Sequence, residues 1–128
     1  MKVLVDTHVA VWIAHEAPEL SRRARDLVGD SSNETLFSMA SAWELAIKQG
    51  LGKIKLRGSS REFVERAVSS GRMTLLAISL DHIDGVAGLA QHHRDPFDRL
   101  LVSQAIAEGV PIISADVALD AYGIERIW

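Results

Sequence analysis

Four acidic residues fall where a predicted strand has just ended or a predicted helix has just begun: Asp6, Glu44, Asp98 and Asp116. Asp6 and Asp116 follow short apolar runs that are typical of buried strands, whereas Glu44 and Asp98 occupy the first turns of predicted helices. Carboxylates that meet repel one another, and each raises the pKa of the others, unless a cation lies among them. Such oxygen ligands suit Mg²⁺ or Mn²⁺, which can activate a water molecule towards a phosphodiester.

Each acid also has a purely structural explanation. Asp6 can cap the helix that follows it, Ser41 and Glu44 fit a capping box, and Asp116 can initiate a turn. For any one acid alone, capping is the commoner role. Four acids brought to one edge of one sheet favour the chemical role.

Two pairs of neighbouring acids require a choice. Asp95 precedes Pro96 and fits the cap of the following helix, so Asp98 is the better candidate ligand. Asp120 lies close enough in the sequence to compete with Asp116 for the fourth position, and the sequence leaves this second choice open.

The elements that must position these acids alternate between strands and helices. Apolar runs predict strands over residues 3–5, 35–39, 73–79, 110–114 and 124–128. Periodic patterns, caps and stops predict helices over residues 7–17, 21–29, 41–50, 60–71, 81–93 and 96–109. Strands without polar alternation favour a parallel sheet covered on both faces. We therefore expect an α/β fold, a three-layer α/β/α domain over residues 1–128 with a central parallel sheet of four or five strands. Ligands bind such sheets beyond the carboxyl ends of the strands.

The composition limits the class of protein. The chain has 128 residues, 48% of them hydrophobic, no cysteine and a formal charge of −3. These values suit one domain and exclude disulfides and thiolate metal sites. No apolar run reaches the roughly 18 residues of a membrane span, and Asp6 interrupts any secretory signal, so we expect a cytoplasmic protein. The acidic balance argues against a duplex-coating role, so a nucleic acid would have to be attracted locally or through bound cations.

The remaining polar and aromatic residues are more often structural than functional. No paired ligand spacing occurs among the five histidines, which we expect to be solvated or structural: His8, His15, His82, His92 and His93. His8 is the one exception to watch, because it lies two residues beyond Asp6. Three residues border the acidic site and either contact RNA phosphates or form a solvated face: His92, Arg94 and Arg99. The densest positive stretch either steers RNA or solubilises a loop: Lys48, Lys53, Lys55 and Arg57. Helical spacing predicts packing roles for three aromatic residues: Trp12, Trp43 and Phe97.

The segments "VLVDTHVAVW", "SAWELAIKQGLGKI", "DPFDRLLVSQA" and "ISAD", in this order and spacing, resemble PIN-domain proteins over essentially the whole chain. The resemblance is strongest to VapC-type toxins of bacterial toxin–antitoxin pairs. It implies a metal-dependent endoribonuclease in which Asp6, Glu44, Asp98 and Asp116 are the catalytic and metal-binding acids. A hydroxyl residue assists the site in that family, and Ser114 occupies the matching position.

The same resemblance implies the cofactor and the partners. The metal would be Mg²⁺ or Mn²⁺ and the substrate RNA. The protein would form a homodimer and bind a cognate VapB-type antitoxin.

Two kinds of alternative remain to be weighed. A haloacid-dehalogenase-type phosphatase requires a second aspartate two residues after Asp6, where this chain has His8. A phospho-acceptor receiver domain requires paired acids after the first strand and a lysine after the last, and neither is present. The other alternative is a PIN-like module that binds RNA or protein without cleaving it. Retention of all four acids argues against such a module.

Overall fold

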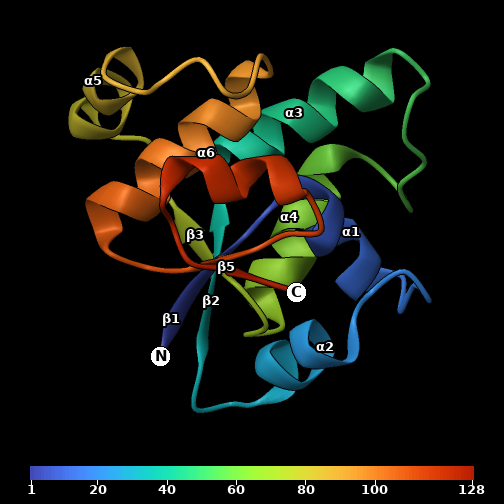
Figure 1. Cartoon of the computed structure of the whole chain (residues 1–128). Helices are drawn as coiled ribbons and strands as arrows, with labels where there is room; N and C mark the ends of the chain where they lie inside the picture. The colour runs from blue at the N-terminus through green and yellow to red at the C-terminus, as the bar shows by residue number, and fades with distance from the viewer.

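The central element is a sheet of five parallel strands, seen in a computed structural model that describes residues 1–128 (Figure 1). The strands are β1 (Lys2–Val5), β2 (Glu34–Ser38), β3 (Thr74–Leu76), β4 (Ile112–Ile113) and β5 (Arg126–Ile127). Their order in the sheet is β3-β2-β1-β4-β5, and every neighbouring pair is parallel. The predicted fold class, with its parallel sheet, is therefore confirmed.

Six α-helices and one short 3₁₀ helix surround the sheet. They are α1 (Thr7–Ala14), α2 (Arg22–Gly29), α3 (Met39–Gly50), α4 (Ser60–Ser69), α5 (Leu80–Ala87), α6 (Pro96–Glu108) and η1 (Val117–Tyr122). None of them combines the length and the apolar character that crossing a bilayer would require.

Side chains alternate across the strands and fill two separate cores. Val3 and Val5 of β1 belong to a core with apolar residues of α1, α2 and α4. Leu4, between them in the sequence, belongs to a second core with residues of α6 and η1. This alternation is a consequence of the two-residue period of a strand, and it produces the three layers that the sequence predicts.

The register of the sheet brings the ends of three strands to one edge. Val5 pairs with Phe37 of β2 on one side and with Ile113 of β4 on the other. Asp6, Ser38 and Ser114 are the residues that directly follow these paired positions. They therefore emerge side by side where the chain leaves the sheet.

Helix α3 differs from its prediction in both its start and its buried face. It begins at Met39, directly after β2, and Ser38 is its cap. Its buried residues are Ala40, Ser41, Glu44 and Leu45. Trp43 is 58% exposed and Ile47 is 39% exposed, so the predicted packing role of Trp43 in the core is wrong. The apolar spacing identified the wrong face because polar residues of this helix are buried against partners from distant parts of the chain.

Several other elements are shorter than the sequence predicts. Helix α5 ends at Ala87, whereas the sequence predicts a helix to residue 93, and residues 88–95 form the connection to α6. Strands β3 and β4 contain only the central residues of their predicted runs. Helix α6 starts and ends as predicted, with Asp95 as its cap and Gly109 at φ 65° as its stop. Trp12 packs as predicted, with its ring centroid 5.6 Å from that of Trp128.

Candidate functional site

Asp6 leaves the end of β1 with its two carboxylate oxygens engaged in different ways. Oδ1 accepts a hydrogen bond of 2.9 Å from the amide of Val9, so the predicted capping of α1 is confirmed. Oδ2 accepts a hydrogen bond from the hydroxyl of Ser114, at the end of β4. Burial raises the pKa of Asp6, while the Ser114 and Val9 hydrogen bonds act in the opposite direction. Capping of α1 by Asp6 therefore does not exclude a role of this carboxylate in the site, because the cap uses Oδ1 only.

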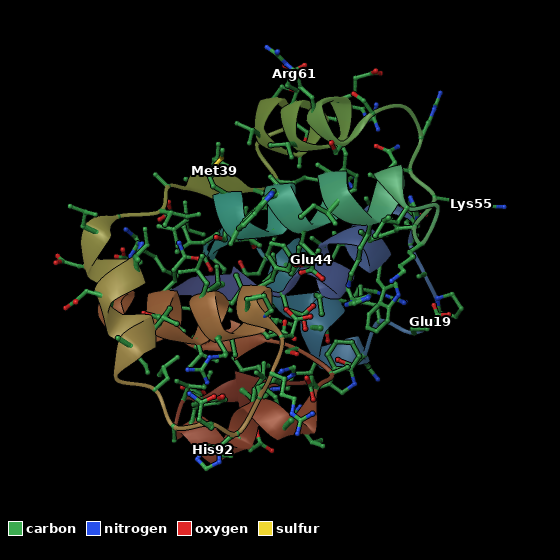
Figure 2. All side chains as sticks on the ribbon, turned by 90° about the horizontal axis from the view of Figure 1, so that it is seen from above. Glu19, Met39, Glu44, Lys55, Arg61 and His92 are labelled. Carbon is green, nitrogen blue, oxygen red and sulfur yellow. The ribbon has the colours of Figure 1, made fainter.

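Glu44 is a buried carboxylate with two partners. Oε1 accepts a hydrogen bond of 2.6 Å from the Thr7 hydroxyl, and Oε2 lies 2.5 Å from the ammonium of Lys48. Figure 2, which looks onto the edge where the strands end, shows Glu44 between α3 and α6, while Met39 of the same helix points to the other side. Only 2% of Glu44 is exposed, so this acid is held at the sheet edge and not in solvent.

The predicted capping box of Ser41 and Glu44 is wrong. The amide of Ala40 donates to the hydroxyl of Ser38, which is the residue that caps α3. The Ser41 hydroxyl instead lies 2.9 Å from the Thr7 hydroxyl. Because the helix begins earlier than predicted, Glu44 lies beyond the first turn and its carboxylate is available to the site.

The two aspartates of "DPFD" have different roles, and Asp95 is the helix cap that the sequence predicts. Asp95 accepts hydrogen bonds from the amides of Phe97 and Asp98, at 2.8 and 3.3 Å. Burial raises the pKa of Asp98 to about 7, and the nearby acids Asp95, Glu44 and Asp6 act in the same direction. The Asp98 carboxylate therefore lies within electrostatic reach of Asp6 and Glu44.

Asp116 lies at the rim of the same site. Its Oδ2 is 2.9 Å from Nε2 of His93, and the same nitrogen is 3.2 Å from Oδ2 of Asp98. Partial burial tends to raise the pKa of Asp116, but the hydrogen bonds from His93 and the Ala118 amide outweigh it and lower the pKa. Its own amide donates to the hydroxyl of Ser114, so this hydroxyl connects Asp116 with Asp6.

The competing residue Asp120 points elsewhere. Its carboxylate is exposed and receives two hydrogen bonds from Arg126, at 2.7 and 3.1 Å. The geometry therefore favours Asp116 over Asp120 as the fourth acid.

His93 and Thr7 are site residues that sequence reasoning missed. Ligand atoms of His93, Asp98 and Asp116 all lie within 4.8 Å of one another, so the expectation that His93 is merely solvated or structural is incomplete. A signal was available, because the imidazole lies two residues before the cap of the strongest helix. Thr7 gave no signal, since only the fold brings its hydroxyl to Glu44.

Other predicted polar roles are settled by contacts. His82 is buried, and its Nε2 lies 2.9 Å from Glu108, so it is structural as expected. Arg99 is also buried and donates to backbone carbonyls, including that of Ala90 at 2.9 Å, so it does not face a substrate. His92 lies at the outer rim of the same connection, exposed (Figure 2).

The donor set fits a hard divalent cation. Four carboxylates and two hydroxyls converge there, and the chain has no cysteine. Burial, and after it the neighbouring acids, raise the pKa of Asp98, so its negative charge is disfavoured when no cation is bound. A divalent cation bound by the carboxylates would compensate it.

Comparisons with known proteins identify the family and the fold. The PIN domain family model matches residues 3–125 of the chain. DNA-bound VapBC from Salmonella typhimurium has a similar structure, with 19% identity, a TM-score of 0.68 and coverage of 99% of this chain and 97% of that one.

Two further solved structures share the fold. VapBC2 from Rickettsia felis, bound to a DNA fragment from their promoter, has 16% identity and a TM-score of 0.68, with coverage of 99% and 98%. FitAcB from Neisseria gonorrhoeae has 13% identity and a TM-score of 0.62, with coverage of 98% and 96%. No curated protein matches the sequence.

Proposed function

Because the chain belongs to the PIN domain family, we propose that it is a metal-dependent endoribonuclease and the toxin of a VapBC-type toxin–antitoxin pair. In this proposal residues 1–128 form a single PIN domain that acts on RNA in the cytoplasm. One observation carries the proposal. Four acids from distant parts of the chain converge at one edge of a parallel sheet, where Asp98 has a pKa raised to about 7.

The acids have distinct tasks in this proposal. Asp6, Glu44 and Asp98 would hold Mg²⁺ or Mn²⁺, directly or through water, and Asp116 would complete the site from its rim. A bound divalent cation would activate a water molecule and neutralise the charge that builds on the phosphodiester oxygens. The hydroxyls of Ser114 and Thr7 hold the Asp6 and Glu44 carboxylates in place.

Two substitutions separate catalysis from helix capping. Asparagine caps a helix about as well as aspartate, so Asp6→Asn keeps the cap and removes one charge from the site. We expect Asp6→Asn to lower the rate of RNA cleavage by at least about 100-fold, as removal of a key electrostatic group does in other enzymes. Asp95→Asn, the matched control, should retain near-normal activity because asparagine keeps the cap and Asp95 is not one of the four proposed ligands.

The assay uses purified protein with single-stranded RNA and either Mn²⁺ or Mg²⁺, and EDTA should abolish cleavage. Cleavage that persists in EDTA, with contaminating nucleases excluded, contradicts the metal mechanism. Binding of Mn²⁺ without cleavage of any RNA in a broad panel would favour the non-cleaving module instead.

We also propose a VapB-type antitoxin as partner. The VapBC assemblies that share this fold support it. A cavity of about 310 Å³ between α1 and α4 offers a place for a partner segment that carries apolar side chains. Its lining includes the apolar residues Ile13, Phe63 and Met73 and the basic residues Arg57, Arg66 and Arg72. A basic side chain of the partner would point towards Asp6, Glu44 or Asp98, since a guanidinium matches carboxylate geometry.

Co-expression with the product of the neighbouring gene tests the partner. We expect that the chain alone arrests growth and that the small neighbouring protein copurifies with it and restores growth. If the folded chain is harmless and no complex forms, the nuclease proposal stands and the toxin proposal fails.

A further inference from the structure

His93 is held by hydrogen bonds at both ring nitrogens. The amide of Asp95 donates to Nδ1 over 3.1 Å. On the other side of the ring, Nε2 lies 2.9 Å from Oδ2 of Asp116 and 3.2 Å from Oδ2 of Asp98. The His93 side chain is 18% exposed, whereas that of Asp116 is 41% exposed, so the ring itself is largely buried at the rim of the site.

The Asp95 amide decides which nitrogen carries the hydrogen. A backbone N–H can only donate, so Nδ1 must present its lone pair to it. A neutral imidazole has one N–H, which must then lie on Nε2. Both contacts of Nε2 are carboxylate oxygens, which accept hydrogen bonds from this N–H.

We propose that His93 is a positioning residue that holds the Asp98 and Asp116 carboxylates through its Nε2–H and that it does not ligate the metal. The inference rests on the proposed function, because the carboxylates it positions are the proposed metal ligands. Ligation through Nε2 would need a lone pair on that nitrogen. The hydrogen would then move to Nδ1, where it would meet the N–H of Asp95.

The backbone around His93 is fixed by residues of two other elements. The amide of His93 donates to the hydroxyl of Tyr122, in η1, over 2.8 Å. Arg99 of α6 donates to that hydroxyl over 3.4 Å and to the His93 carbonyl over 3.5 Å. The imidazole is therefore placed by α6 and η1, the elements that begin next to Asp98 and Asp116.

A chemical consequence distinguishes the two roles. With His93 as a donor, the metal ligands are oxygens only, and the site retains a preference for Mg²⁺ or Mn²⁺. With His93 as a ligand, imidazole would favour Zn²⁺ or Ni²⁺ instead.

The first test is the ¹⁵N NMR spectrum of the imidazole in the metal-free full-length wild-type protein. We expect the signature of a neutral ring with hydrogen on Nε2 and a bare Nδ1. A ring with hydrogen on Nδ1 would overturn the proposal. This measurement requires neither a variant nor RNA cleavage.

The second test measures the Mn²⁺ affinity of the His93→Gln and His93→Ala variants by calorimetry. Circular dichroism checks that both variants fold. The glutamine amide can still donate, so we expect His93→Gln to bind within a few-fold of wild type. His93→Ala should bind about 10- to 100-fold more weakly, as residues that orient metal ligands do. His15→Ala, at an exposed histidine that follows α1, is the control and should be unchanged.

Equal losses in His93→Gln and His93→Ala would indicate that the imidazole itself binds the metal. If the expected NMR signature and affinity pattern appear but no RNA is cleaved, the positioning role stands and the proposed nuclease fails. If wild type cleaves RNA but the ring has hydrogen on Nδ1, the nuclease stands and the positioning role fails.

Discussion

At the scale of single residues, the site contains acids with opposite pKa shifts. The pKa of Asp98 is raised to about 7 by burial and by the nearby acids Asp95, Glu44 and Asp6. Asp116, more exposed and hydrogen-bonded by His93, has a lowered pKa. The charge of Asp98 therefore opposes folding when no cation is bound.

Asp98→Asn should change how the stability of the metal-free protein depends on pH. A carboxyl group with a higher pKa in the folded state binds its proton more tightly there, so it favours folding below its unfolded pKa of 3.8. That contribution is lost as the pH rises through about 7. Asparagine stays neutral, so at pH 8 the variant should be more stable than wild type by on the order of 1 to 3 kcal/mol.

Urea unfolding in EDTA at pH 4, 6 and 8 measures this difference. Asp84→Asn, which removes an exposed charge on α5, is the control and should leave the pH dependence unchanged. A stability difference between wild type and Asp98→Asn that does not grow with pH would show that the Asp98 carboxylate is adequately compensated without metal.

At the scale of elements, α5 and α6 approach closely at a glycine. A Cβ atom at Gly85 would lie 2.4 Å from the hydroxyl oxygen of Ser103 in α6. That hydroxyl donates to the carbonyl of His82 over 2.5 Å. Glycine therefore weakens the helical propensity of α5 but permits the contact that stabilises it.

Gly85→Ala should destabilise the protein by about 1 to 3 kcal/mol, the usual cost of overpacking. The added methyl group would displace the Ser103 hydroxyl and break its hydrogen bond to His82. The double variant Gly85→Ala/Ser103→Ala should cost less than the sum of the single variants, because the clashing oxygen is gone.

Thermal and urea unfolding of the four members of this cycle provide the measurement. Gly88→Ala, at the C-cap of the same helix, is the control, since the nearest atom to its added Cβ would be 3.8 Å away. Additive losses in the double variant would show that the cost of Gly85→Ala does not arise from Ser103.

At the scale of the whole molecule, one face of α3 carries apolar side chains without a partner in the chain's own core. Met39, Trp43 and Ile47, each four residues from the next, are 42%, 58% and 39% exposed. Trp43 packs edge-on against Phe97, with ring centroids 4.9 Å apart, and the rest of its surface is free. If the chain forms the homodimer that the family resemblance implies, we expect two copies to meet at this face.

Ile47→Glu should shift the protein from dimer to monomer, because it places a charge opposite its own copy in a symmetric apolar interface. Sedimentation equilibrium at micromolar concentration measures the mass. Ile106→Glu, at a 53% exposed apolar residue on α6, is the control and should leave the mass unchanged. A wild-type protein that is already monomeric would contradict the homodimer.

The sequence by itself determined the order and type of the elements and the parallel sheet. Apolar strands alternate with periodic helices, and this pattern predicts the three layers. It also determined features that depend on contacts within a few residues, such as the Asp95 and Asp6 caps and the glycine stop of α6. A cap and its amides lie two or three residues apart, so local sequence is sufficient to predict them.

Only the tertiary structure decided which polar groups share the site. Glu44 is buried because α3 begins directly at the end of β2 and places it beside Thr7, 37 residues away. His93 reaches Asp116 across 23 residues, and Ser114 reaches Asp6 across 108. Such contacts depend on the register of the sheet and on the packing of whole helices, which the spacing of residues along one helix does not encode. For the same reason, the apolar spacing of α3 indicated the wrong buried face, since the fold buried the polar residues that had partners there.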